Sequence, residues 1–563
     1  MYDEIKTIVY IYCQNRSFNN LFGTFPGADG VSNATQTSII QLDRDGKTPL
    51  TILPPIWSAK LTTKPLNNTQ LEGLTLAVSP QIPQPKGWPK ITVADTYGKP
   101  NNYFYLDDPF GYNLTPTGAT RDMFHRFYQN QMQINNGANN QFAAWADSGG
   151  LVMGLWDGSN LPLWDVAKKY TLCDNFFQGA FGGSYLNHQY IYCATTPYYP
   201  NASVRVPEII SVVNSDGTTL TLTNDAQNRS ALLGPPIYIN DNSLTPDGFC
   251  VNTMQPPYHP SENLYNYPHI RHNQYADPNK HTTQPPIPQG TPRTPLYTHN
   301  VPKDFNGAIY SFGDLLNDNN ISWTFWSGGL SKALNNVRLG LKPSQTKDIY
   351  QSHHQAPNFY ANMAPGTANR EEHFKDTGYD DINFMNAVKT GTLPQFSYFI
   401  PTGNFNMHAG YADIYSGNKY VADLITALEQ SPQWSNMLVV ITWDENGGIW
   451  DHVSPPKADR WGPGTRIPAL IISPFAKSGY VDHTQYDSAS LLRFVINKFN
   501  LTPLKGITLR DESLKKNGFV PMGDLSNSLN LPFLYLNENI KIIIWCILLI
   551  TICVIIYKKI KKV

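Results

Sequence analysis

Short apolar runs rich in β-branched residues constrain the fold of this chain most strongly. Residues 5–13 read IKTIVYIYC, residues 437–442 read MLVVIT and residues 467–473 read IPALIIS. Their lack of regular polar alternation is typical of strands that are buried on both faces. We therefore expect an interior sheet that is covered on both sides.

Segments with helical character alternate with these strands. Helices are expected at residues 121–136, 161–171, 308–317, 417–430 and 488–500, and β-hairpins at 204–235. Strands that alternate with helices indicate an α/β fold with a mainly parallel sheet. Residues 1–516 are predicted to form one large domain, with long loop insertions around 30–120 and 200–305.

Composition excludes several classes of protein. The 42 Lys and Arg residues balance 43 Asp and Glu residues, for a net charge of -1, and only 15% of the chain is charged. This balance lacks the basic surface that binds nucleic acid, so no nucleic-acid partner is predicted. An aromatic content of 12% argues against a mostly disordered chain.

The C-terminal region contains a long uncharged apolar run. Residues 542–557 read IIIWCILLITICVIIY, and as a helix they would extend about 24 Å at 1.5 Å per residue. Lysines at both ends can extend their stems towards the membrane surface. We predict a linker at 517–539, a single-pass membrane anchor at 540–558 and a basic tail at 559–563. The alternative is a buried core helix.

The side of the membrane stays open at this point. Lysines after the apolar run favour a cytosolic C-terminus, which would place the large domain across the membrane. Residues 1–13 lack the basic and long apolar regions of a signal peptide. Either the domain is cytosolic and anchored by its tail, or an export signal lies upstream of this chain.

Two predicted strands end in polar residues. Residues 5–13 are followed by Gln14 and Asn15, and residues 437–442 by Trp443, Asp444 and Glu445. Ligands of open α/β sheets lie at the carboxyl ends of the strands, and hard divalent cations prefer oxygen ligands. The segment is a candidate metal site, although a polar turn before Gly447 and Gly448 is the alternative.

A third segment, Gly182-Gly183-Ser184, can present a serine hydroxyl on a tight turn before a helix. The N-terminus of such a helix favours a nearby anion. The segment lacks the G-x-S-x-G pattern of acyl-transfer enzymes. A plain turn is the alternative interpretation.

Together these segments resemble the bacterial phosphoesterase family of acid phosphatases and phosphatidylcholine-type phospholipases C, most closely its acid phosphatase branch. The resemblance extends from Ile5 to about Leu501. The matching segments are Asn15-Arg16-Ser17-Phe18, His125 to Gln129, Gly182 to His188, His353-His354-Gln355, His408 to Tyr411, Asp444 to Gly448, Asp451-His452-Val453 and Arg466-Ile467-Pro468.

The resemblance implies an alkaline-phosphatase-like core and hydrolysis of a phosphate ester through a phosphoseryl intermediate. Ser184 matches the nucleophile, His353, His354 and His408 match positions that line the phosphate pocket, and His125 lies in a matching motif. A divalent metal ion of unknown identity would be held by Gln14, Asn15, Ser184, Asp444 and Glu445. Imidazolium groups at the phosphate would favour an acidic working pH.

One departure from the family pattern is chemically important. Gln14 stands where the family usually has Glu, which keeps an oxygen but removes a charge, and Asn19 replaces a common Asp. A phosphomonoesterase is the leading hypothesis. A phospholipase C and a catalytically impaired, membrane-anchored binding protein remain alternatives.

Overall fold

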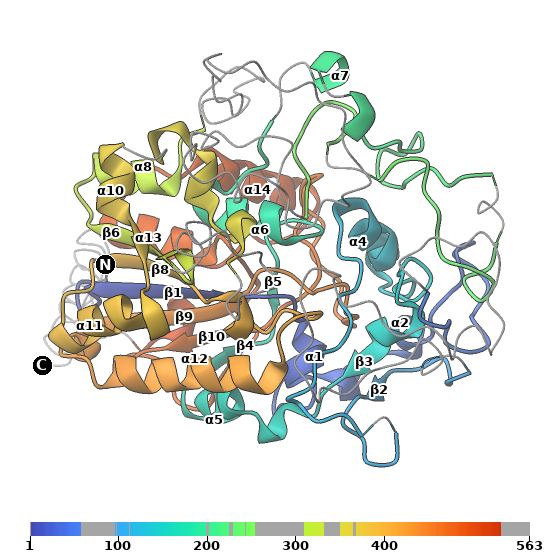
Figure 1. The fold of residues 1–563 in the computed structure, drawn as a ribbon, viewed down its shortest axis with the longest axis horizontal. Coiled ribbons are helices and arrows are strands. Elements are labelled where there is room, and N and C mark those ends of the chain that lie inside the picture. The colour runs from blue at the N-terminus through green and yellow to red at the C-terminus, as the bar shows by residue number, and fades with distance from the viewer. Residues whose placement is uncertain are drawn as a thin grey trace, which may run out of the picture.

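A central eight-stranded sheet organises the molecule (Figure 1). The computed structural model describes residues 2–57, 96, 98–111, 113–198, 202–205, 207–224, 229–241, 244–253, 309–331, 350–363 and 367–530. In spatial order the strands are β11 (Tyr480–Asp482), β4 (Thr171–Cys173), β10 (Ala469–Ile472), β9 (Met437–Trp443), β1 (Thr7–Cys13), β8 (Phe396–Ile400), β6 (Trp323–Ser327) and β7 (Phe374–Asp376).

The sheet is mainly parallel, as predicted. β10 alone among its strands runs antiparallel, to both β9 and β4. Two small parallel pairs lie outside it: β12 (Tyr486–Asp487) with β5 (Phe176–Phe177), and β2 (Phe104–Tyr105) with β3 (Gly154–Leu155). The predicted α/β fold is therefore confirmed.

Helices cover both faces of the sheet (Figure 1). On one side lie α5 (Pro162–Lys169), α11 (Ile382–Thr390) and α12 (Ile414–Glu429); on the other lie α6 (Ser184–Cys193), α8 (Phe312–Asp318), α10 (Ala368–His373), α13 (Ser490–Phe499) and α14 (Lys505–Lys516). The remaining α-helices in the described part are α1 (Phe18–Phe22), α2 (Gln36–Ile39), α4 (Phe127–Ile134) and α7 (Ala202–Arg205).

Side chains of β1 alternate between two hydrophobic cores. Val9 and Ile11 join the core under α12, whereas Ile8 and Tyr10 join the core under α13. All four are at most 1% exposed. This two-sided burial explains why the strand reads as a continuous apolar run rather than as an alternating one.

Several predicted elements differ from the structure. Helix α4 begins only at Phe127, because residues 121–126 form no regular secondary structure and Arg126 has an extended backbone. The predicted hairpins at 204–235 are not regular strands; their described residues form short helical turns and isolated bridges such as Val213 to Leu220. Residues 517–530, at the start of the predicted linker, pack on the body through the buried Leu525 and Leu529.

The predicted location in a membrane is corrected by the structure. Within the described ranges, no helix combines the length and apolar character that a membrane crossing requires. Even α12, with 16 residues, extends only about 24 Å, against a hydrocarbon core of about 30 Å. The predicted anchor at 540–558 falls outside the described residues.

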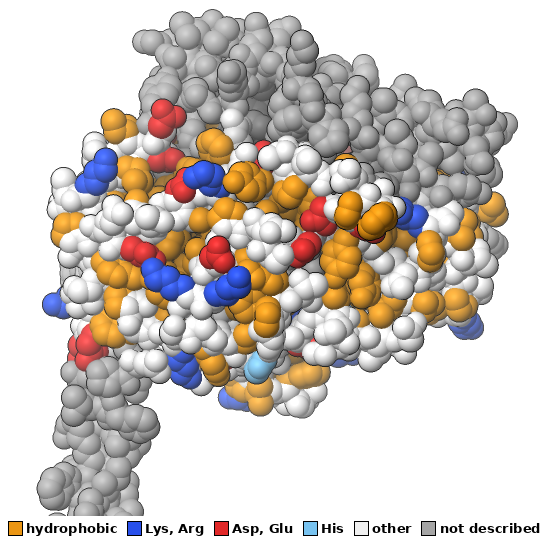
Figure 2. All heavy atoms as spheres, turned by 90° about the horizontal axis from the view of Figure 1, so that it is seen from below, with side chains coloured by type: hydrophobic (Ala, Val, Ile, Leu, Met, Phe, Trp, Pro, Cys, Tyr) orange, Lys and Arg blue, Asp and Glu red, His pale blue; other side chains and the backbone are white. Residues whose placement is uncertain are grey.

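Charges of both signs are interspersed on the face that includes α5 and α12 (Figure 2). Lys169 pairs with Glu429 at 2.8 Å, and Lys419 with Asp423 at 2.6 Å. Such exposed pairs contribute about 0–1 kcal/mol each. The visible face therefore has no large region of one sign.

Arg466 connects several loops at the carboxyl edge of the sheet through hydrogen bonds. Its Nε donates to Asp451 Oδ1 at 2.9 Å, and its Nη1 donates to the carbonyls of Asp29 and Asp174 at 2.7 and 2.8 Å. Its Nη2 donates to Asn19 Oδ1 at 3.0 Å. Both members of the Arg466–Asp451 pair are fully buried, so each depends on the other for compensation of its charge.

Replacing Arg466 by Met should therefore lower the free energy of unfolding by about 3–5 kcal/mol, because Asp451 would remain buried and unpaired. Urea-induced unfolding measures this loss. Arg460→Met is the matched control: its pair with Asp247 is about half exposed, and its loss should change stability by about 0–1 kcal/mol. Equal effects of the two variants would contradict the assigned role of Arg466.

A second prediction concerns Asp29. A hydrogen bond from His452 holds the pKa of Asp29 at about 2, below its ordinary value. The resulting stabilisation is present above the unfolded pKa of about 4 and is lost as the pH falls towards 2. The difference in melting temperature between wild type and Asp29→Asn should shrink between about pH 5 and pH 2. A constant difference would contradict this coupling.

Candidate phosphate-ester and metal site

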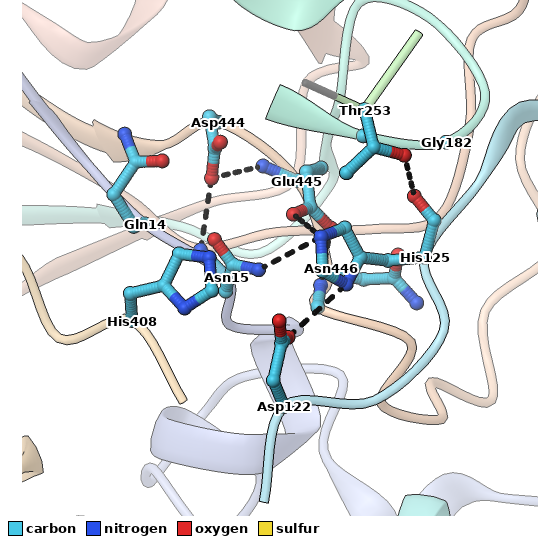
Figure 3. Close-up of polar contacts among 12 residues, drawn as sticks. Gln14, Asn15, Asp122, His125, Gly182, Thr253, His408, Asp444, Glu445 and Asn446 are labelled. Atoms are coloured by element: carbon cyan, nitrogen blue, oxygen red, sulfur yellow. Dashed lines mark hydrogen bonds and ion pairs between the residues drawn. The ribbon is translucent and has the colours of Figure 1, made fainter. Parts of the chain in front are cut away.

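The carboxyl ends of β1 and β9 bring two polar segments together (Figure 3). Cys13 and Trp443 are partners in the parallel register, so the residues that follow them leave the sheet side by side. Asn15 N donates to Asp444 Oδ1 at 2.8 Å. The polar segments that follow the two strands therefore lie side by side.

Backbone conformation fixes this junction. Asn15 has a φ of 60°, a left-handed conformation that Asn tolerates better than most residues. Gly447 has a φ of +63°, and a Cβ there would lie 2.7 Å from the carbonyl oxygen of Asn15. Glycine at 447 thus permits the close approach of the two segments.

Ser184 is the first residue of α6 and is fully buried. The turn before it requires Gly182, which has a φ of +84° and lies where a Cβ would be 2.3 Å from Phe127 N. Burial raises the pKa of Asp444, and the nearby Ser184 hydroxyl opposes this rise. The hydroxyl nevertheless lacks a partner with hydrogen-bond geometry.

The N-terminus of α6 differs from the expectation of an anion site. Tyr185 N donates to the carbonyl of Thr253 at 2.8 Å, and Leu186 N donates to the carbonyl of Asn252 at 3.3 Å. Two N–H groups of the first turn are therefore occupied by protein. An anion beside Ser184 would need other partners.

The four predicted histidines lie in one cluster. The rings of His353 and His354 are 4.3 Å apart, those of His354 and His408 are 6.4 Å apart, and those of His408 and His125 are 5.9 Å apart. His353 and His354 lie on a 3₁₀ turn, Ser352–His354, and His408 lies before α12.

His125 connects this cluster to the strand ends. Its Nε2 lies 3.4 Å from Asn15 Nδ2 and 3.6 Å from Glu445 Oε1, while its Nδ1 faces the carbonyl of Met123 at 2.5 Å (Figure 3). Asp122 Oδ1 lies 3.5 Å from the same Nδ1. His125 thus meets an amide and a carboxylate of the predicted metal set.

Burial keeps His125, His354 and His408 neutral in the absence of a bound anion. Desolvation lowers the pKa of His125 to about 4. It lowers the pKa of His354 and His408 well below the ordinary value, and neighbouring histidines lower both further. The imidazolium groups expected from the sequence are therefore disfavoured unless a negative ligand compensates them.

Two carboxylates are buried at the end of β9. Burial raises the pKa of Asp444 to about 7, against hydrogen bonds from Asn15 N and Glu445 N. Burial raises the pKa of Glu445 well above the ordinary value, and the charge of Asp444 raises it further. Burial thus disfavours the charged form of both carboxyl groups, and at Glu445 the neighbouring negative charge adds to this penalty.

The predicted metal-binding residues fit a divalent cation. Each residue is fully buried and has an oxygen without a hydrogen-bond partner: Gln14 Oε1, Asn15 Oδ1, Ser184 Oγ, Asp444 Oδ2 and Glu445 Oε1. Buried oxygens without partners are energetically unfavourable. A set that combines two carboxylates with neutral oxygens is the type that hard divalent cations prefer.

His188 is a site residue for which the sequence analysis assigned no role. It lies one helical turn after Ser184 and 4.0 Å, at Nε2, from Asp444 Oδ2. With His354 and Asp444 it forms a further potential metal-binding group. However, the rings of His188 and His354 stack at 4.8 Å with an interplanar angle of 4°, and one ion cannot lie in the planes of two stacked rings.

The i, i+4 spacing from Ser184 was the signal that could have identified His188, because such residues share one face of a helix. Asp122 was also missed. It lies three residues before His125, and it forms a second potential metal-binding group with His125 and His408.

The fold and site define an α/β protein with an oxygen-rich, histidine-lined centre at the carboxyl edge of its sheet. The Phosphoesterase family matches residues 5–502. The chain belongs to this family.

Individual relatives match shorter stretches. The non-hemolytic phospholipase C of Burkholderia pseudomallei (strain K96243) is 34% identical over 140 residues, 20% of each protein. Phospholipase C B of Mycobacterium tuberculosis (strain CDC 1551 / Oshkosh) is 24% identical over 247 residues, 38% of this chain and 45% of that protein. The chain therefore spans less than half the length of either relative.

A solved structure from the alkaline phosphatase superfamily, from Vibrio parahaemolyticus, is 11% identical. It aligns with 36% of this chain and 50% of its own, with a TM-score of 0.22. This similarity is too low to carry an argument about the core.

The site predicts opposite effects on stability with and without metal. Asp444→Asn should leave the melting temperature in chelator unchanged or raised, because it removes a buried charge, but should greatly reduce the stabilisation by Mn²⁺. At 100 times the dissociation constant, Mn²⁺ should stabilise the wild type by about 2.7 kcal/mol. Thermal unfolding with chelator and with Mn²⁺ measures both effects.

Asp487→Asn is the matched control. Asp487 is also buried, but it lies 3.4 Å from Arg510 rather than at the site. This variant should lose stability under both conditions and keep the increment due to Mn²⁺. An unchanged increment in Asp444→Asn would contradict the metal assignment.

Proposed function

We propose that this protein hydrolyses phosphoric esters with Ser184 as the nucleophile beside a divalent metal ion. The observation that carries the proposal is the set of buried oxygens without partners on Gln14, Asn15, Ser184, Asp444 and Glu445. Membership of the Phosphoesterase family supports the same reaction class. The alkaline-phosphatase-like core remains part of this proposal.

Ser184 is suited to attack phosphorus. Its position as the first residue of helix α6 supports this role, as does its interaction with Asp444. Its Oγ loses its proton to solvent and forms a bond to phosphorus as the bond between phosphorus and the ester oxygen breaks. Water then attacks phosphorus, the bond between phosphorus and Oγ breaks, Oγ regains a proton and phosphate is released. A divalent cation held by the five oxygens would neutralise charge on the phosphoryl group and favour the serine alkoxide.

The histidines bind and protonate the substrate in this proposal. With two N–H groups of α6 occupied, His353, His354 and His408 are the candidates to contact phosphoryl oxygens. A bound phosphate would raise the pKa values of His354 and His408, which burial lowers, so proton uptake would accompany binding. His125, beside Glu445, is a candidate to supply the proton that the leaving alcohol needs.

The proposed substrate class is a phosphate monoester, as in acid phosphatases. A second candidate, a phospholipid headgroup ester, is favoured by the names of the relatives, which are phospholipases C. The two substrates differ in the groups that are esterified to phosphorus. Parallel assays with p-nitrophenyl phosphate and with phosphatidylcholine micelles therefore distinguish the two candidates.

The decisive substitution is Ser184→Ala. It should lower kcat by on the order of 10⁴-fold or more, because the nucleophile is removed. Hydrolysis is measured with both substrates between about pH 4 and pH 8, with and without divalent metals, since histidines titrate in this range. Ser473→Ala is the control: Ser473 is equally buried but donates to the carbonyl of Met437 at the opposite edge of the sheet, and its kcat should stay near that of the wild type.

A wild type that is inactive with every metal, but active as Gln14→Glu, would contradict the proposal for the natural sequence. It would favour the impaired binding protein that the loss of charge at Gln14 suggests. Activity that survives in Ser184→Ala would contradict the assignment of the nucleophile.

A further inference from the structure

The side chain of Gln14 has one defined partner. Its Nε2 lies 2.9 Å from His188 Nε2, while its Oε1 is buried without a hydrogen-bond partner. An amide can be turned end for end at little steric cost, which would exchange the oxygen and the nitrogen. The hydrogen bond with His188 therefore decides whether the oxygen or the nitrogen of Gln14 faces the metal-binding oxygens.

The chemistry of the two atoms decides their roles. An amide nitrogen only donates hydrogen bonds, so His188 Nε2 has to accept and cannot carry a hydrogen. Neutral His188 then carries its hydrogen on Nδ1, a buried atom that has no hydrogen-bond partner in the structure. If Gln14 were turned round, its NH₂ group would occupy the position of an oxygen ligand and could not bind a cation.

Packing fixes the ring of His188. It is fully buried, stacks on His354 at 4.8 Å and meets the edge of Tyr12 at 4.9 Å with an interplanar angle of 83°. Because aromatic neighbours hold the ring on two sides, its Nε2 remains directed at Gln14. The same stacking keeps His188 from sharing one metal ion with His354.

We propose that His188 is a positioning residue that accepts a hydrogen bond from Gln14 and so directs the Gln14 oxygen to the metal ion. The proposal rests on the metal site of the proposed function, but it does not depend on hydrolysis. It gives the neutral Gln14 a specific arrangement that a carboxylate would not need, since both oxygens of Glu are equivalent.

The first test is metal affinity, measured by isothermal titration calorimetry with Mn²⁺ alone. His188→Phe keeps a flat ring but has no acceptor, and it should weaken Mn²⁺ binding about 10- to 100-fold, as losses of outer hydrogen-bond partners of metal ligands do. His188→Gln restores an acceptor and should recover most of the affinity. His373→Gln is the control, since His373 is also buried and stacked, on Trp323 at 4.3 Å, outside the site.

The second test reads the tautomer of His188 directly and requires neither metal nor activity. In chelator-treated wild type, the ¹⁵N chemical shifts of His188 should show a hydrogen on Nδ1 and none on Nε2. In Gln14→Glu the carboxylate cannot donate, so the hydrogen should move to Nε2. This second result holds even if His188→Phe fails to fold.

A hydrogen on Nε2 in the wild type would overturn the proposal, because Gln14 would then present its nitrogen to the site. Wild-type Mn²⁺ affinity in a folded His188→Phe would overturn it as well. Loss of hydrolysis with both readouts as expected would instead contradict only the proposed function.

Discussion

Two adjacent carboxylates buried at the end of a central strand dominate the physics of this protein. Asp444 and Glu445 are fully buried beside β1; burial raises the pKa of each, and the charge of Asp444 raises that of Glu445 further. The parallel pairing of β1 with β9 fixes the position of the two carboxylates, because it places Gln14 and Asn15 beside Asp444 and Glu445. Much of the surrounding geometry can be understood as compensation for this concentration of negative charge.

The compensation is incomplete in the protein alone. Backbone N–H groups of Asn15 and Glu445 satisfy one oxygen of Asp444, but the other has no partner. Such a centre destabilises the empty protein and favours a cation, which is the usual balance between stability and function at an active site. The neutral Gln14 reduces the negative charge of the set, and His188 then becomes important for orienting it.

The sequence predicts the parts of the fold that depend on burial. The strand at 5–13 and the helix at 417–430 have continuous or periodic apolar patterns, and both are present. The strands β6 and β8 were not predicted because Ser and Thr interrupt their aromatic residues irregularly, which gives neither a continuous apolar run nor a regular alternation. The hairpins expected at 204–235 failed because β propensity alone, without a core face, does not produce a sheet.

At the site, the sequence locates residues but not their surroundings. Ser184, His125 and the oxygen set were identified by resemblance, and the structure brings them together. Partners that depend on tertiary contact were not predictable: the carbonyl of Thr253 that occupies the start of α6, and the hydrogen bond between His188 and Gln14. The neutral state of the buried histidines likewise follows from packing.

The most direct test of the central claim is to trap the covalent intermediate. Wild-type protein loaded with metal, mixed with p-nitrophenyl phosphate and quenched in acid, should carry one phosphoryl group on the peptide that contains Ser184, as mass spectrometry can detect. Ser184→Ala should carry none. Turnover by the wild type without phosphorylation of Ser184 at any time before completion would contradict the account.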